Sequence, residues 1–452
     1  GTIMNTGVTE VGGGALATGS TDNVRWEIVA PNTASGTFSL LIRQGSDTAN
    51  SRTVLETWTN LSLDPKASNY ISRVLGDQTQ TVATDGSSYY IQTTGSYNNI
   101  SAYVRVKSVN YQTPDYFDNT GTAKNQFTGS LPIASSGSFN GATGTPFTQR
   151  VGKFYDQAGL TANADAQGVT GSDYTVMLNL LANPDEYSYN VISAPGLNRV
   201  SAATQISTIV SNAQNRGDNI AVVDMVPYGT ALATVTGQAL AMDTSYGATY
   251  WPWVQTADPN LGNNVWAPAS TLIPAVYAFN DNSSEAWFAP AGFNRGGLST
   301  VVRAERKLAQ GDRDSLYQGN VNPIATFPNQ GVVVFGQKTL QKKASALDRV
   351  NVRRLLITVK DYISQIADTL VFEQNTLATR NSFLAQVNPY LTSVQQRQGL
   401  YAFKVIMDDS NNTADVIDRN ELIGQIYLQP TKTAEFIYLD FNLTPTGATF
   451  PG

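Results

Sequence analysis

The densest group of potential metal ligands in the chain lies in residues 408–421, DDSNNTADVIDRNE. Carboxylate and amide oxygens are the donors that calcium prefers, but an EF-hand loop also needs a glycine at its sixth position. Counted from Asp409, that position is Ala414, and a strand rather than a helix is expected before the loop. A turn between two strands is therefore favoured, and no metal or other cofactor is expected.

A second group of charges opens a long amphipathic segment, residues 347–363, LDRVNVRRLLITVKDYI. Asp348 suits the N-cap of a helix, and Arg349, Arg353 and Arg354 follow it within the first turns. Cations at a helix N-terminus oppose the macrodipole by roughly a few tenths of a kcal/mol each unless they are paired. Carboxylate partners across a contact are therefore expected, with solvated arginines or a phosphate or RNA site as alternatives.

Histidine and cysteine are both absent from the sequence. Their absence excludes Ser-His-Asp and Cys-His catalysis, histidine-ligated zinc and disulfides. Carboxylate chemistry remains open, and a glycosidase would need two facing carboxylates in an aromatic-lined cleft. The stretches YWPWVQ and WFAPAGFNRGG could line such a cleft, whereas a packed loop with Arg295 paired inside the core explains the second stretch more simply.

The charge balance argues against two classes of partner. The net charge is −6, from 29 basic and 35 acidic residues without a long run of either sign, so no nucleic-acid partner is expected. No apolar run approaches the ~18–20 residues that span a bilayer, so no membrane insertion is expected. Only 14% of the residues are charged, which suits close packing between copies of the chain, although a β-rich domain with polar loops explains it equally well.

The first part of the chain is expected to contain a lead-in, a domain and a linker. Residues 1–20 are glycine-rich and polar, which indicates a flexible lead-in, and residues 21–110 are expected to form a β-rich domain. Alternating apolar residues predict strands in VRWEIVA, TFSLLIRQG and SAYVRVKSV, and NYISRVLG is typical of a short helix. Residues 111–150 are rich in turn-forming residues, which predicts a linker or long loop.

Residues 151–452 are expected to form an α/β domain, in which amphipathic helices flank a mixed β-sheet. A buried strand in YSYNVISAPG, a helix over residues 201–217 and a strand in DNIAVVDMV indicate a crossover unit with parallel strands. An amphipathic helix is expected over residues 348–371, and a second one over 376–394 that Pro389 should kink or divide. Three further strands are expected: YAFKVIMDD, ELIGQIYLQP and EFIYLDFNL.

The last of these strands is apolar on one face. Ile437, Leu439, Phe441 and Leu443 alternate along the strand and therefore share one face. Together with Phe436 they form the candidate segment for strand exchange: Phe436, Ile437, Leu439, Phe441 and Leu443. Such a strand at a sheet edge presents unpaired N–H and C=O groups to other chains. Either its own domain covers it, or it pairs with another chain.

An ordered series of motifs resembles a known family. In order and spacing, residues 266–450 resemble the C-terminal half of the contractile tail sheath proteins of myovirus-type bacteriophages. The similarity is fainter in FSLLIRQGSDTANSRTVLETWTNLSLDP and fades over residues 110–180. The motifs that carry the resemblance are WFAPAGFNRGG, RDSLYQGNVNPI, VVFGQKT, LDRVNVRRLLITVKDYI, FEQNTLATRNSF and NNTADVIDRNELIGQIYLQPTKTAEFIYLDFNLTPTGATF.

The resemblance implies a structural subunit of the virion. Sheath subunits form stacked hexameric rings around the tail tube, exchange terminal strands with neighbouring copies, and contract to drive the tube through the host envelope without a cofactor. The partners implied are copies of the chain, the tail tube protein, and baseplate and tail terminator proteins. The candidate inter-subunit or tube-facing charges are Asp348, Arg349, Arg353, Arg354, Asp418 and Arg419. A buried structural pair inside the core is the alternative for several of them, including Asp418, and for Arg295.

Two other classes remain as alternatives: a different tail or baseplate protein of the virion, and a carboxylate-based glycosidase. A tube protein is usually shorter and dominated by a β-barrel, and no motif supports the enzyme. The chain opens at Gly1 and lacks the family's usual N-terminal arm, which indicates a processed or recombinant fragment. Part of the strand exchange would then be missing, so we expect this chain to stay monomeric or weakly associated.

Overall fold

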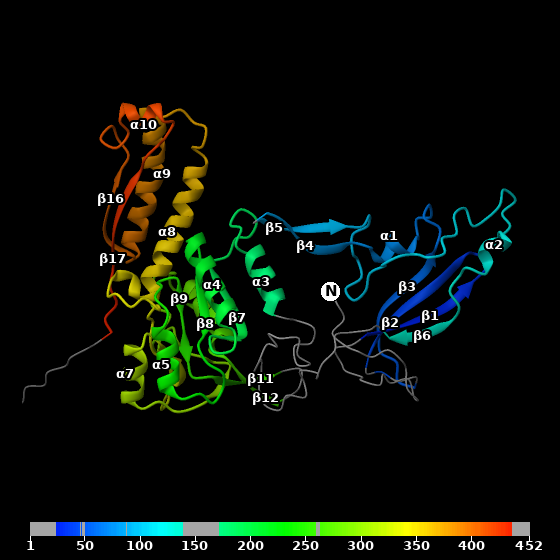
Figure 1. The fold of residues 1–452 in the computed structure, drawn as a ribbon, viewed down its shortest axis with the longest axis horizontal. Coiled ribbons are helices and arrows are strands. Elements are labelled where there is room, and N and C mark those ends of the chain that lie inside the picture. The colour runs from blue at the N-terminus through cyan, green and yellow to red at the C-terminus, as the bar shows by residue number, and fades with distance from the viewer. Residues whose placement is uncertain are drawn as a thin grey trace, which may run out of the picture. The chain divides into compact units, whose positions relative to one another are not determined.

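The computed structural model describes residues 24–45, 47, 50–86, 88–138, 171–258 and 263–435. The chain divides into an N-terminal unit, Gly1–Ser188 with Ser201–Thr208, and a C-terminal unit, Tyr189–Val200 with Ile209–Gly452. The main division therefore falls near residue 188, and not at the expected residue 150. Helices and small sheets alternate along the chain, which confirms the expected mixed α/β class (Figure 1).

The N-terminal unit is built on a four-stranded antiparallel sheet with strand order β3-β2-β1-β6. The predicted strands near residues 24 and 37 and the short helix near residue 71 are confirmed, because their apolar side chains share one core. The elements of this sheet and its neighbouring helix are β1 (Val24–Asn32), β2 (Thr37–Gln44), β3 (Val54–Ser62), β6 (Ser135–Ser138) and α1 (Ile71–Leu75).

One strand expected in this unit does not form. Residues 101–109 form no strand, because the Ser101 hydroxyl accepts the backbone N–H of Val104 at 3.0 Å and holds a turn. The described part of the expected linker or long loop, residues 111–138, is mostly irregular and packs against the core of this unit. Tyr116 is only 4% exposed, and its hydroxyl donates to the carbonyl of Thr33 at 2.6 Å, so a few apolar anchors suffice to dock an irregular segment.

Smaller elements complete the N-terminal unit. A two-stranded antiparallel hairpin was not predicted, because its threonine-rich strands show little apolar alternation. The hairpin and the remaining helices are β4 (Thr79–Asp85), β5 (Ser88–Thr94), α2 (Asn125–Thr128) and α3 (Gly171–Leu180).

The C-terminal unit contains an α/β core with three small sheets. The predicted crossover is confirmed: β7 (Val191–Asn198) and β8 (Ile220–Asp224) are parallel, with α4 (Ala203–Arg216) between them in sequence. The other strands of the core are β9 (Gly247–Ala248), β10 (Tyr250–Trp251), β11 (Val254–Asp258), β12 (Asn263–Ala267), β13 (Val301–Ala304), β14 (Asn322–Phe327) and β15 (Gly331–Val334). The further helices are α5 (Leu232–Leu240), the 3-10 helix η2 (Ala269–Thr271), α6 (Ile273–Ser283) and α7 (Gln310–Gln318).

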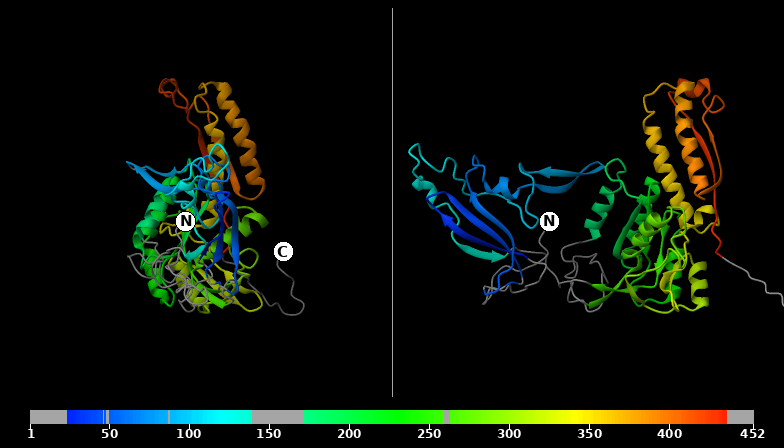
Figure 2. Two further views of the ribbon diagram at one scale, coloured as in Figure 1. Left: turned by 90° about the vertical axis from the view of Figure 1, so that its right-hand side faces the viewer. Right: turned by 180° about the vertical axis from the view of Figure 1, so that it is seen from behind.

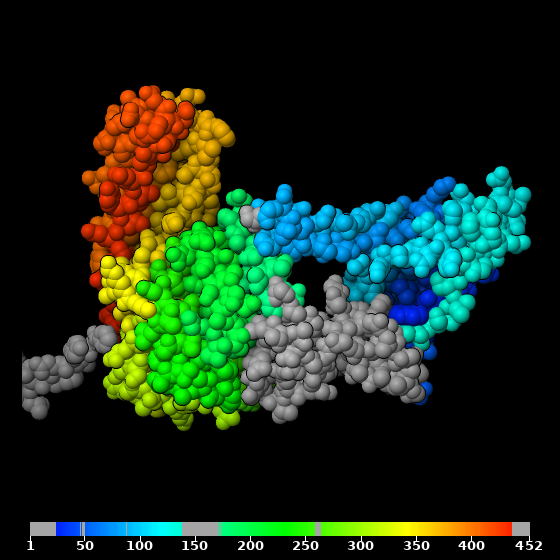
Figure 3. All heavy atoms as spheres, in the orientation of Figure 1, coloured from blue at the N-terminus to red at the C-terminus, as the bar shows by residue number. Residues whose placement is uncertain are grey.

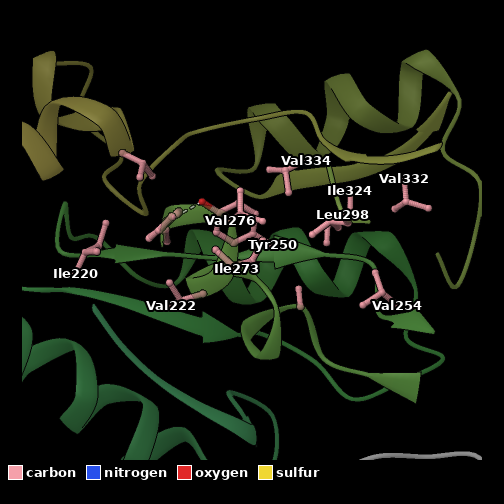
Figure 4. Packing of buried hydrophobic residues seen from close by; sticks show 14 of the residues in the cluster. Ile220, Val222, Tyr250, Val254, Ile273, Val276, Leu298, Ile324, Val332 and Val334 are labelled. Atoms are coloured by element: carbon pink, nitrogen blue, oxygen red, sulfur yellow. Dashed lines mark hydrogen bonds between the residues drawn. The ribbon is translucent and has the colours of Figure 1, made fainter. Parts of the chain in front are cut away.

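Buried aliphatic side chains from several of these strands and helices form one cluster. Val222, Ile273 and Val276 belong to the same cluster as Ile324 and Val334 (Figure 4). The hydroxyls of Tyr250 and Tyr277 lie 2.7 Å apart, so each of these two buried hydroxyls has a partner. The core therefore holds the surrounding helices in fixed positions.

A helical hairpin with a two-stranded sheet forms the second part of the C-terminal unit. The elements are α8 (Val350–Asp368), α9 (Leu377–Gln396), β16 (Leu400–Ile406), α10 (Ala414–Asp418) and β17 (Gln425–Pro430). The β16–β17 sheet packs against the hairpin over a shared core (Figure 2). Two of the three predicted closing strands are thereby confirmed, and the third lies largely outside the described residues.

Pro389 does not divide the second helix, because α9 runs unbroken through it. Pro389 is exposed, while Val387, Leu391 and Val394 on the opposite face are fully buried. The packing of this buried face holds the helix together, and the hydrogen bond that the proline removes lies on the solvent-exposed face.

Candidate functional site

The segment that follows β17 is held on the core by a group of polar side chains, which we name the C-terminal anchor. It begins with Thr431, whose hydroxyl donates to the carbonyl of Gln398 at 2.7 Å. Its main members come from α7, from the loop after β15, from the start of α8 and from the segment after β17. They are Tyr317, Gln337, Arg349, Thr433 and Glu435.

Glu435 is the centre of the anchor. The Arg349 guanidinium donates two hydrogen bonds to it, from Nε to Oε1 at 2.7 Å and from Nη2 to Oε2 at 2.9 Å. This bidentate geometry is the strongest form of an arginine–carboxylate pair. The Tyr317 hydroxyl also donates to Glu435 Oε2. These two side chains therefore supply three donor atoms to one carboxylate.

Gln337 binds the segment after β17 from the buried side of the anchor. Its side chain is 3% exposed, and its Nε2 donates to Thr433 Oγ1 at 2.7 Å and to Glu435 Oε1 at 3.3 Å. Its backbone carbonyl accepts the N–H of Val350 at 2.7 Å, so the same residue also fixes the start of α8. The anchor therefore connects the chain after β17 to the core rather than to another loop.

The surroundings of the anchor shift the pKa values of three side chains. Burial alone would lower the pKa of Arg349, but the hydrogen bond and charge of Glu435, together with the neighbouring Tyr317 and Asp348, outweigh burial, and the pKa is raised. Burial and the bond to Glu435 also raise the pKa of Tyr317, so its hydroxyl keeps its proton. Burial and the neighbouring Arg349 lower the pKa of Lys338, whose ammonium lies 4.6 Å from the Tyr317 ring.

The geometry of the anchor suits positioning. Among the described residues its carboxylates are Glu435 and Asp348, and both pair with Arg349. Within the described residues no group of three or more metal-ligating side chains occurs, and no helix is long and apolar enough to cross a membrane. Trp251, Trp253 and Trp287 are buried in the core, which agrees with the packed-loop interpretation and not with the alternative of an aromatic-lined cleft.

Two of the predicted charges occupy this site. Arg349 is the N-cap residue of α8, and Asp348 lies 3.0 Å from its guanidinium. Arg349 therefore has the carboxylate partner that was expected, but this partner, Glu435, belongs to the same chain. Sequence reasoning missed Tyr317, Gln337 and Glu435, because no local pattern links residues that are so far apart.

Arg353 and Arg354 are not surface charges, which corrects their expected role. Arg353 is 5% exposed, lies 3.9 Å from the Tyr246 ring and donates to the Ser245 hydroxyl. Arg354 is 4% exposed and pairs with Asp281 at 2.5 Å. Both guanidiniums hold α8 on the core, so neither can meet another molecule directly.

Asp418 and Arg419 lie at α10, at the other end of the helical hairpin from Arg349 (Figure 1). Both are exposed, and Arg419 makes a surface pair with Glu421 at 3.1 Å. Arg295, in turn, is held in its loop, where it lies 5.1 Å from the Phe288 ring and donates to the carbonyl of Ala289. The strand Phe436, Ile437, Leu439, Phe441 and Leu443 lies outside the described residues.

The sequence matches two family models, the phage tail sheath protein central domain over residues 167–340 and the phage tail sheath C-terminal domain over residues 342–444. It is 32% identical over 372 residues to the tail sheath protein of Vibrio phage KVP40, covering 76% of this chain and 52% of that protein. It is 35% identical over 230 residues to the tail sheath protein of Enterobacteria phage T4, covering 51% of this chain and 35% of that protein. The chain thus spans about half, or less, of the length of these relatives.

Two solved structures, of a sheath complex and a baseplate, are also similar to the chain. The sheath complex of an extracellular contractile injection system, PVC, in the contracted state matches with a TM-score of 0.52 and 26% identity, over 60% of this chain and 74% of that chain. The baseplate of the anti-feeding prophage matches with a TM-score of 0.51 over 61% of this chain and 74% of that chain. At 23% identity, this second match shows likeness of fold alone.

Proposed function

Because the chain belongs to the phage tail sheath protein family, we propose that it is a structural subunit of a contractile tail sheath in a virion. Copies of the chain polymerise as stacked hexameric rings around a tail tube. Contraction of the polymer drives the tube through the host envelope, with no enzymatic step and no cofactor. The partners of the subunit are its own copies, the tube protein, and baseplate and tail terminator proteins.

The observation that carries this proposal is the position of the C-terminal anchor. Glu435 is fixed by donors from α7 and α8, and the apolar strand that we expect to pair with another copy starts at the next residue, Phe436. A fixed departure point reduces the number of conformations that the strand must lose when it pairs. The anchor therefore supports a role for residues 436–443 as an arm that reaches a neighbouring subunit.

The β16–β17 sheet offers a place for such an arm. Among the described residues it has only these two strands, which pair in an antiparallel register from Ile406 opposite Gln425 to Leu400 opposite Pro430. A two-stranded sheet is marginally stable alone, and an added strand supplies main-chain hydrogen bonds to an edge. We therefore propose this sheet as the acceptor for the arm of a neighbouring copy.

The surface charges have two roles in this proposal. Asp348 and Arg349 act on assembly indirectly, because they hold the base of the arm. Asp418 and Arg419 remain candidates for direct inter-subunit or tube contacts, since both are exposed at α10. Charged contacts that exchange partners suit a lattice that slides between two states.

Electron microscopy of the full-length protein assembled with its tail tube tests the proposal, since this chain alone is expected to stay monomeric or weakly associated. We expect striated tubes that become shorter and wider on contraction. Tubes that assemble with smooth walls, or no decoration of the tail tube at all, would rule out the sheath function.

A further inference from the structure

The end of the helical hairpin at α10 carries an exposed apolar group, which we name the apex: residues 368–380 and 408–421. Phe372 is 99% exposed there, and Val371 and Leu377 are each 60% exposed. Hydrogen bonds from the Asn375 side chain to the carbonyl of Glu421, at 2.8 Å, join the two segments of the apex. In Figure 3 this end of the hairpin (orange) projects as a free surface of the C-terminal unit.

The backbone at Phe372 has a conformation that its side chain does not favour. Its φ is +71°, in the left-handed region where Cβ crowds the following carbonyl. The exposed ring contributes no core packing in return. Strained residues of this kind persist where the surrounding structure fixes them, and they are concentrated at functional sites. Here the N–H of Glu373 donates to the carbonyl of Leu370 at 3.0 Å and closes the turn.

The apex is also strongly acidic. Its two segments contain seven Asp or Glu and two Arg, a formal net charge of −5. One of the arginines, Arg380, is buried and pairs with Asp409 at 2.7 Å. The apex therefore presents apolar side chains within a negative rim, which calls for a partner with an apolar centre and positive charge.

The same unit carries a complementary surface on its α/β core, which we name the base: Phe293, Phe327, Phe335 and Arg313. The three rings contact one another with centroids 4.9–5.7 Å apart, and Phe293 and Phe335 are 50% and 40% exposed. The Arg313 guanidinium lies 5.2 Å from the Phe327 ring. Asp312 and Asp314 flank Arg313 in α7. The longer chain segment that carries Arg313, Phe327 and Phe335, residues 301–349, holds eight Lys or Arg and four Asp or Glu, a formal net charge of +4.

Resting on the proposed sheath assembly, we propose that the apex of one copy docks on the base of a second copy, with Phe372 against the aromatic cluster. Both surfaces are apolar at their centre, and the chain segments that carry them are opposite in net charge. They are different patches of one subunit, so the contact is heterologous and repeats from copy to copy. A heterologous contact that does not close generates a helical polymer, which is the form a sheath requires.

Cross-linking tests this contact directly, because the chain has no native cysteine to interfere. A Phe372→Cys protein is mixed with a Phe335→Cys protein that carries a size tag, and a short bis-maleimide is added. The matched control replaces Phe372→Cys with Val200→Cys, at a residue that is 52% exposed on another surface. We expect severalfold more tagged heterodimer with Phe372→Cys than with the control.

Equal yields in the two mixtures would overturn the proposal, since the apex would then serve the arm, the tube or another partner. Phe372→Gly provides a second test, because glycine adopts the left-handed backbone without strain. It should melt at the same or a higher temperature than the parent and yet decorate tail tubes poorly. Normal striated tubes from Phe372→Gly would contradict the apex contact, while the sheath function would stand.

Discussion

Arg349 and Glu435 form two parallel hydrogen bonds, 2.7 and 2.9 Å long, between the first turn of α8 and the chain after β17. The pair decides where the C-terminal segment leaves the subunit. An arginine that opposes the dipole of its own helix is locally unfavourable, and Glu435 compensates for it. The same contact therefore stabilises the start of α8 and positions the arm.

Glu435→Gln should loosen the arm without unfolding the subunit. The substitution removes the charge-assisted pair with Arg349, which should lower the free energy of unfolding by about 1 kcal/mol, given the partial exposure of both side chains. Limited proteolysis should cut sooner after residue 430. Glu421→Gln removes an exposed pair with Arg419 and should change neither measurement. Equal protease sensitivity in the two variants would show that the anchor does not hold the arm.

Asp47 should stabilise the N-terminal unit in a pH-dependent way. Its carboxylate is buried between Arg25 at 3.2 Å and Arg43 at 2.8 Å, so Asp47→Ala should lower the free energy of unfolding by about 3–5 kcal/mol. Burial would raise the pKa of Asp47, but the hydrogen bonds from Arg43, Thr53 and Arg25 together outweigh burial, and the pKa is lowered. The stabilisation should therefore be present at neutral pH, above the unfolded-state pKa, and be lost as the pH falls through the folded-state pKa.

Urea unfolding of the parent and the Asp47→Ala variant from pH 7 to the most acidic stable pH measures this difference. The difference in the free energy of unfolding between the parent and Asp47→Ala should become smaller as the pH falls. Asp115→Asn, at an exposed pair with Lys66, is the control and should leave the stability unchanged. If the difference in the free energy of unfolding between the two proteins stayed constant with pH, the role assigned to the buried carboxylate would be contradicted.

Asp224 should have the opposite pH dependence. Complete burial raises its pKa to about 7, although the Ser270 hydroxyl and N–H both donate to it. Because the folded-state pKa lies above the unfolded-state value, its contribution is largest in acid and is lost as the pH rises toward 7. Asp224→Asn should remove this loss and increase the stability of the C-terminal unit at pH 7. Denaturation profiles that have the same slope between pH 4 and 7 in both proteins would refute the assignment.

Substitution of a buried arginine should lower the stability of the protein, whereas substitution of an exposed arginine should impair only its assembly. Arg354→Ala leaves Asp281 without its partner and should lower the free energy of unfolding by about 2–3 kcal/mol. Arg419→Glu changes an exposed charge and should leave the melting temperature unchanged while tube decoration falls. Thermal melts and electron micrographs of the two variants distinguish these outcomes, and a normal melt for Arg354→Ala would contradict its internal role.

Much of the fold could be predicted from the sequence, because local periodicity marks elements that bury one face. Examples are the confirmed α8, with buried Val352, Leu355 and Val359, and the confirmed crossover from β7 to β8. The resemblance to sheath proteins is confirmed by both family models. Rules based on local sequence failed where tertiary packing determines the structure. One example is Pro389, where the buried face of α9 keeps the helix continuous through the proline.

The site itself could be predicted only in part. The unfavourable charges at the start of α8 correctly indicated that carboxylate partners were needed, and the fold supplies Glu435 and Asp281. Which carboxylates these are depends on how distant segments pack, and the sequence has no local signal for that. The burial of Arg353 was missed for the same reason, since an arginine on a helix is usually exposed.

The most direct test of the account is to end the protein after Glu435, so that the anchor remains and the arm is removed. The truncated subunit should keep the parent melting temperature, because the described core ends at the anchor. Electron microscopy should show bare tail tubes where the parent gives striated sheaths. Striated sheaths of normal length from the truncated subunit would contradict the central claim that the C-terminal arm joins one subunit to the next.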